Sequence, residues 1–107
     1  MTTFDDREKQ FETEFAHDAS LKFKVESRRA KLVGSWAAGK MGLTGDEAEE
    51  YAKSVARADM EEAGHEDVFR KLRADLDGAR EAVSDDEIRG KMAECLDEAL
   101  RQVRGQA

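Results

Sequence analysis

The sequence predicts an all-α protein, and three observations support that class. Charged residues make up 40% of the 107 residues and β-branched residues are few, a mixture typical of helices. Proline is absent, so no helix is interrupted for lack of a backbone donor. Apolar residues recur at helical spacings between glycine-containing breaks. We therefore expect one domain, a four-helix antiparallel bundle over residues 19–104, preceded by a mobile arm over residues 1–18 that is able to form a helix.

The first bundle helix is expected from Asp18 to Met41. Four apolar residues share one face and should be buried: Leu21, Val25, Leu32 and Trp36. From residue 19 on, the segment is locally basic, with six lysines and arginines against Glu26 alone. Phe23 lies nearly opposite the apolar face, so it is either a packing residue of a second face or an exposed contact.

The second helix follows a turn that contains Gly39, Gly42 and Gly45. Thr44 and Glu47 have the spacing of a capping box, in which two side chains satisfy the free amides of a helix start. The helix should run to about Ala63, with Gly64 at its C-terminal end. Its expected buried face is Ala48, Tyr51, Ala52, Val55 and Ala56.

Two further helices complete the expected bundle. The third begins near His65 and places Phe69, Leu72, Leu76 and Ala79 on one stripe. Ser84 and Glu87 have the spacing of a second capping box. The fourth helix follows it, with an inward face formed by Ile88, Met92, Cys95, Leu96, Ala99 and Val103.

The N-terminal arm carries an aromatic stripe. At about 100° per residue, Phe4, Phe11 and Phe15 lie within roughly 40° of one another on a helix, and the residues between them are polar. The stripe is about 70° out of phase with the apolar face of the first helix. It is therefore less suited to extend that face, and two alternatives remain open: docking on the protein's own body or on a partner. The acidic charge of the arm disfavours an anionic membrane surface.

Charge and composition exclude several classes of protein. The net charge of −7 argues against a nucleic-acid binder, which would have a basic surface. A single cysteine, Cys95, allows no intramolecular disulfide and suits a reducing compartment. No apolar stretch is long enough to insert into a membrane, and no secretory signal opens the chain. We expect a cytoplasmic protein.

Catalytic and metal-binding patterns are weak, so we do not expect an enzyme or a metal site. His17 and His65 are the two histidines, and they are far apart in sequence. No catalytic triad or HExxH spacing is present. Cys95 lies on an apolar stripe and is expected to pack as a small core residue. Histidine titrates near neutral pH, so a pH-dependent switch through His17 or His65 is a further hypothesis.

A phosphate or nucleotide site is a weaker possibility. The three glycines after the first helix do not match the phosphate-binding loop pattern. The basic first helix and the helix start near Thr44 are nevertheless groups that hold phosphate, and contacts would be expected near Arg28, Arg29 or Gly42. The alternative is a glycine connector beside solvated lysines.

Several motifs, together with the arrangement of an N-terminal arm and four expected helices, make the sequence resemble the ζ subunit family, the ATPase-inhibitor subunits of alphaproteobacterial ATP synthases. The most specific block is Ala63-Gly64-His65-Glu66-Asp67-Val68-Phe69-Arg70-Lys71. The others are Phe4-Asp5-Asp6-Arg7, Phe15-Ala16-His17-Asp18, Phe23-Lys24, Arg28-Arg29, Lys31-Leu32, Trp36-Ala37-Ala38 and Tyr51-Ala52-Lys53. The resemblance runs from about Phe4 to Ala99, and its last helix matches in pattern more than in identity.

The resemblance implies a four-helix bundle that inhibits the F1-ATPase of ATP synthase. In the family, the N-terminal segment wedges into a catalytic interface between the α and β subunits, against the γ subunit, and blocks rotation during ATP hydrolysis. Carried over to this chain, it implies an inhibitory region over residues 2–18 and a location on the inner membrane's periphery, through the synthase. Its partner-binding residues would be Phe4, Asp5, Arg7, Phe11 and Phe15. No cofactor is required, although an adenine nucleotide (ATP or ADP) bound to the bundle is an alternative function.

Overall fold

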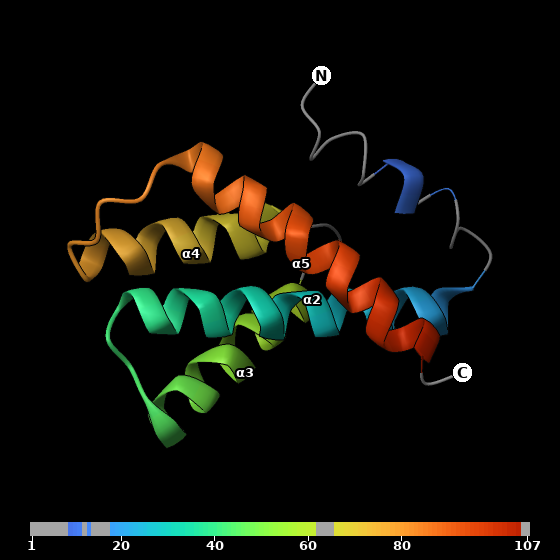
Figure 1. Cartoon of the computed structure of the whole chain (residues 1–107), viewed down its shortest axis with the longest axis horizontal. Coiled ribbons are helices and arrows are strands. Elements are labelled where there is room, and N and C mark those ends of the chain that lie inside the picture. Colours follow the sequence, from blue (N-terminus) through green and yellow to red (C-terminus); the bar gives the residue numbers. More distant parts are fainter. Residues whose placement is uncertain (1–8, 12, 14–17, 62–65, 106–107) are drawn as a thin grey trace.

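The computed structural model describes residues 9–11, 13, 18–61 and 66–105, and the regular elements in this part are α-helices. Four of them are long: α2 (Ala19–Lys40), α3 (Gly45–Glu61), α4 (Glu66–Gly78) and α5 (Asp85–Gly105) (Figure 1). Residues 9–11 and 13 are helical as well. The all-α class is thus confirmed for the described residues. None of the helices described there is both long and apolar enough to cross a membrane.

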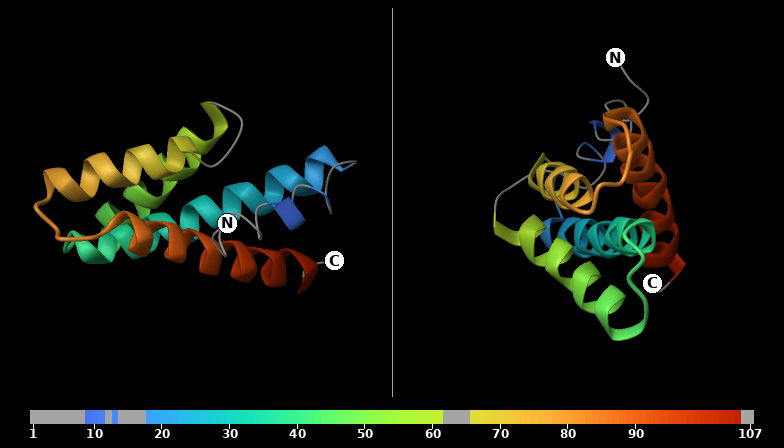
Figure 2. Two further views of the ribbon diagram at one scale, coloured as in Figure 1. Left: turned by 90° about the horizontal axis from the view of Figure 1, so that it is seen from above. Right: turned by 90° about the vertical axis from the view of Figure 1, so that its left-hand side faces the viewer.

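Helix α2 occupies the centre of the molecule. It packs against α3, α4 and α5, and α3 and α5 lie on different sides of it (Figure 2). Successive long helices reverse direction along the chain (Figure 1). A helix covered by several neighbours has a wide buried sector, so its buried residues are not confined to one narrow apolar stripe, even though another side of the helix stays exposed.

This central position explains why the predicted apolar face of α2 is only partly right. Val25 is fully buried, whereas Leu21, Leu32 and Trp36 are partly buried. Most of the other buried positions carry small side chains: Ala30, Val33, Gly34, Ala37 and Ala38. Small residues let neighbouring backbones approach closely, which an apolar-periodicity count does not detect.

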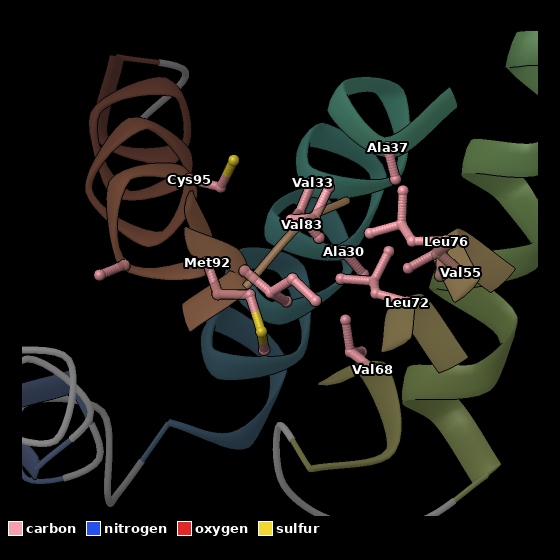
Figure 3. Packing of buried hydrophobic residues seen from close by; sticks show 13 residues of the cluster. Ala30, Val33, Ala37, Val55, Val68, Leu72, Leu76, Val83, Met92 and Cys95 are labelled. Carbon is pink, nitrogen blue, oxygen red and sulfur yellow. The ribbon is translucent and has the colours of Figure 1, made fainter. Parts of the chain in front are cut away.

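The other helices follow their predicted faces more closely. On α3, Ala52, Val55 and Ala56 are buried, while Ala48 and Tyr51 are partly buried. All six predicted inward residues of α5 are buried. On α4, Leu72 and Leu76 are buried, and Phe69 is partly buried and packed against the core. Val68 is buried as well, which was not predicted. The prediction is wrong at Ala79, which lies exposed beyond the helix end. Figure 3 shows the resulting core, in which side chains of α2, α3, α4 and α5 meet.

Two helix starts are capped by side chains. The Asp18 carboxylate accepts a hydrogen bond of 3.0 Å from the Leu21 amide at the start of α2. The Ser84 hydroxyl accepts one of 3.0 Å from the Glu87 amide, so one half of the predicted capping box is formed. The Glu87 carboxylate, which would complete the box, lies 3.4 Å from the Lys40 ammonium.

The capping box predicted at Thr44 is not formed. Gly45 opens α3 with a left-handed φ of +57°, and the backbone carbonyl of Thr44 closes the first turn by accepting from the Ala48 amide at 3.4 Å. Within the described part of the chain, no side-chain bond joins Thr44 to the Glu47 amide. The predicted end of this helix at Gly64 lies outside the described residues.

Candidate functional site

Of the five residues expected to bind a partner, Phe11 lies within the described part of the chain. Phe4, Asp5, Arg7 and Phe15 lie outside it. The two histidines of the proposed pH switch, His17 and His65, also lie outside the described residues. The structure therefore bears directly on one of these five residues, Phe11.

Phe11 is docked on the protein's own body. Its side chain is 1% exposed and belongs to a cluster of buried apolar residues from α2 and α5. The other buried members are Val25, Leu96, Ala99 and Val103, with Leu21, Leu32 and Leu100 partly buried around them. In Figure 2 the short blue segment that carries Phe11 lies beside these two helices. Of the two alternatives left by the sequence, docking on the body is the one observed at this position, and the partner-binding role stays a prediction.

A cavity of about 560 Å³ lies beside this contact. The arm side of the cavity is Lys9, Gln10, Phe11 and Thr13, and the α5 side is Leu96, Asp97, Leu100 and Arg104. Phe11, Leu96 and Leu100 are the apolar residues of this lining, and the others are polar or charged. Complete burial of a phenylalanine contributes about 1.5–3 kcal/mol, so this single ring accounts for a modest attachment energy.

A second groove of about 550 Å³ runs along α2 and is basic. It is lined by Phe23, Lys24, Ser27, Arg28, Lys31, Leu32, Ser35 and Gln102. The Phe23 ring is 50% exposed, so it is not a packing residue of a second buried face, and its role as a contact stays a prediction. Gln102 of α5 closes one side, and its Oε1 accepts a hydrogen bond of 3.3 Å from an Arg28 guanidinium nitrogen.

The structure places the three residues named for a phosphate or nucleotide site in different surroundings, while binding itself stays a prediction. Arg29 is 1% exposed, so it cannot form part of a surface phosphate site together with Arg28. Gly42 follows the far end of α2, 14 positions from Arg28, or about 21 Å along a helix. Arg28, Arg29 and Gly42 are therefore not brought together, and only Arg28 lines the basic groove.

Cys95 is a core residue, as predicted. Its side chain is buried on α5, and burial raises the pKa of its thiol to about 11, although Lys91 and Arg29 act in the opposite direction. A thiol that stays protonated at neutral pH is a poor nucleophile. Among the described residues, no three His, Cys, Asp or Glu side chains are grouped so that they could hold a metal ion.

The most specific sequence block has a structural role in its described part. Arg89 of α5 donates two hydrogen bonds to the Glu66 carboxylate of α4, at 3.2 and 3.3 Å, and its guanidinium lies 4.0 Å from the centre of the Phe69 ring. Asp67 pairs with Arg70 within α4. Two residues of the block thus join the start of α4 to α5. Sequence reasoning missed Arg89, because its spacing to Glu66 is not helical.

Tyr51, from the motif Tyr51-Ala52-Lys53, joins α3 to α4. Its hydroxyl donates a hydrogen bond of 2.8 Å to the Asp75 carboxylate, and Lys71 donates one of 3.0 Å to the same oxygen. The Lys71 ammonium also lies 5.2 Å from the centre of the Tyr51 ring. Burial, and then the bond to Asp75, raise the pKa of Tyr51. These residues join neighbouring helices of the body, whereas the two cavities described above are lined mainly by the arm, α2 and α5.

Comparisons with known proteins give a matching family and a similar solved structure. The family model described as ATPase inhibitor subunit zeta matches residues 1–102. A structure solved in solution by NMR is 44% identical in sequence, with a TM-score of 0.71, and the match covers 82% of this chain and 100% of that chain. No curated protein sequence matches significantly.

Proposed function

Because the chain belongs to the ATPase inhibitor subunit zeta family, we propose that it is a regulatory subunit, not an enzyme, that inhibits the F1-ATPase of ATP synthase. The observation that carries this proposal is the family match over residues 1–102, which includes the N-terminal arm. We assign inhibition to the arm, residues 1–18. Residues 19–104 form the folded body, an antiparallel four-helix bundle that carries the arm.

In the proposed mechanism, the arm enters a catalytic interface between the α and β subunits, against γ, and blocks rotation in the hydrolysis direction. Phe4, Phe11 and Phe15 are its apolar anchors, and the charges of Asp5 and Arg7 set its orientation. Helices that bind in grooves use apolar anchors at such spacings. The partner interface therefore competes with the body for Phe11.

This competition has a calculable cost. Phe11 is buried against α2 and α5, so it must leave that cluster before it can enter another groove. If its burial contributes about 1.5–3 kcal/mol, the released arm is a minor population, and the apparent affinity for F1 falls by about 10- to 150-fold. Variants that weaken the docked state should consequently inhibit at lower concentration.

The first experiment is an ATP hydrolysis assay on purified F1, with the full chain and a variant that lacks residues 1–14. We expect inhibition by the full chain and none by the truncated protein, while circular dichroism shows that the body remains helical. Full inhibition by the truncated protein would refute an inhibitory arm.

A matched pair of substitutions tests the competition for Phe11. Leu100→Ala removes a partly buried contact of the docked state from the α5 side without altering the arm, so the concentration needed for half-inhibition should fall. Phe11→Ala removes the same anchor from the arm docked on the body and from the arm bound to F1. Although the arm is released more easily, its affinity for F1 falls as well, so this variant should lose inhibition. Equal potency of Leu100→Ala and the unchanged protein would show that release of Phe11 does not limit binding.

A second candidate function is adenine-nucleotide binding, and the basic groove on α2 is the observation that favours it. The groove combines the exposed Phe23 ring with Lys24, Arg28 and Lys31. An aromatic face and cations are the groups that would hold a base and phosphates. Titration of isotopically labelled protein with ATP or ADP tests it: shifts confined to the groove are expected, and a spectrum without change contradicts it.

A further inference from the structure

The cations of the basic groove form a regular row. Lys24, Arg28 and Lys31 stand at positions i, i+4 and i+7 of α2, so they follow one face over about 10 Å, or two helical turns. Phe23 lies beside the row and is the one large apolar side chain of the described residues that is exposed. The groove thus offers a line of positive charge with an apolar contact at its edge.

Two of these cations have no carboxylate partner among the described residues. Elsewhere on the surface, Lys40, Lys53, Lys71 and Lys91 each lie 2.8–3.8 Å from a carboxylate. By contrast, the structure places no carboxylate of the described residues against Lys24 or Lys31. Two such lysines in one groove, on a chain with a net charge of −7, indicate a surface complementary to an acidic partner.

The shape of the row favours a helix over a single phosphate group. Phosphate sites gather backbone amides or converging side chains at one point, commonly at a helix N-terminus. In α2 the Asp18 carboxylate already occupies the N-terminus, and the groove cations are spread along the helix body. Carboxylates at positions i, i+4 and i+7 of a second helix would match that spacing.

We infer that the basic groove is a second contact with the ATPase, in which the folded body binds an acidic amphipathic helix on the outer surface of F1. The inference rests on the proposed function. The arm and the groove lie on one chain, so engagement of the groove holds the arm at a high effective concentration near its interface. The groove thereby raises affinity, whereas the arm blocks rotation.

The test compares two double charge reversals in the full chain. Lys24→Glu with Lys31→Glu reverses the groove, and Lys53→Glu with Arg57→Glu makes the same change in net charge on exposed positions of α3. Binding to immobilised F1 and inhibition of ATP hydrolysis are measured at low and high salt, after circular dichroism has shown that both variants are folded.

We expect the groove variant to bind F1 about tenfold or more weakly than the α3 variant, mainly through slower association, with a smaller salt dependence. Maximal inhibition at saturating protein should be unchanged. Equal binding by the two variants would overturn the inference while leaving the proposed function intact. Absence of binding by the unchanged protein would overturn both. Displacement of the body from F1 by ATP, with shifts confined to the groove, would identify a nucleotide site and also overturn the inference.

Discussion

Replacing Gly34 by alanine should destabilise the protein, although alanine is the better helix former. A Cβ atom at this position would lie 2.9 Å from the Ala52 Cα atom and 3.1–3.2 Å from two side-chain atoms of Val55. The nearest of these is backbone, so α2 and α3 would have to move apart. At Gly34, therefore, the two helices lie too close together to admit a Cβ atom without a shift.

Gly90 provides the matched control. It lies within α5, and a Cβ atom built there would meet nothing within 4 Å. Both substitutions gain about 1 kcal/mol of helix propensity, whereas Gly34→Ala also incurs an overpacking cost of about 1–3 kcal/mol. We expect Gly90→Ala to raise the free energy of unfolding by about 1 kcal/mol and Gly34→Ala to lower it by up to about 2 kcal/mol.

The assay is urea unfolding followed by circular dichroism and by the fluorescence of Trp36, the single tryptophan. The propensity terms cancel between the two variants, so the difference in their free energies of unfolding measures the overpacking cost. At about 4 °C per kcal/mol, the same difference should separate their melting temperatures by about 4–12 °C. Equal stabilisation by both substitutions would refute the claim that the α2–α3 contact depends on a missing side chain.

The remaining predictions concern three contacts of the body. Because the folded state raises the pKa of the Cys95 thiol from 9.0 to about 11, its contribution to stability should be complete below pH 9 and lost as the pH rises towards 11; urea titrations over that range measure this loss, and a flat profile would contradict it. The native thiol should also react slowly with Ellman's reagent at pH 8 compared with the urea-unfolded thiol. Tyr51→Phe should lower the free energy of unfolding by about 0.5–1.5 kcal/mol, because it removes the hydrogen bond to Asp75; an unchanged urea midpoint would show that the bond contributes nothing. Arg89→Lys keeps the charge but loses the guanidinium that lies over the Phe69 ring, so thermal melting should show that the free energy of unfolding falls by about 0.5–1 kcal/mol. An unchanged melting temperature would show that the contact with Phe69 depends on the charge alone.

Apolar periodicity and capping residues predicted the helices well, because helix formation depends on residues that lie a few positions apart in the sequence. The inward face of α5 is correct at all six positions, since α5 packs with one side and its periodicity is regular. The cap at Ser84 is likewise determined by residues three positions apart. The capping box predicted at Thr44 is wrong, because the left-handed conformation of the next residue, Gly45, determines how the chain enters α3.

The lining of the basic groove could be predicted only in part from the sequence. The basic character of α2 is plain from its composition. Arg28 and Arg29 are adjacent in sequence, but Arg28 lines the groove whereas Arg29 is buried. The placement of neighbouring helices decides which side of α2 is covered, and no local rule contains that information. Gln102 reaches the same groove from the other end of the chain.

The sequence by itself determined the all-α class, the apolar faces of the single-sided helices, the family and the position of the aromatic stripe at the N-terminus. Only the tertiary structure decided that Phe11 is buried against α2 and α5 and that Lys24 and Lys31 remain without a carboxylate of the described residues beside them. The physical reason is that helix formation depends on residues a few positions apart, whereas burial and charge balance depend on side chains that meet from distant parts of the chain.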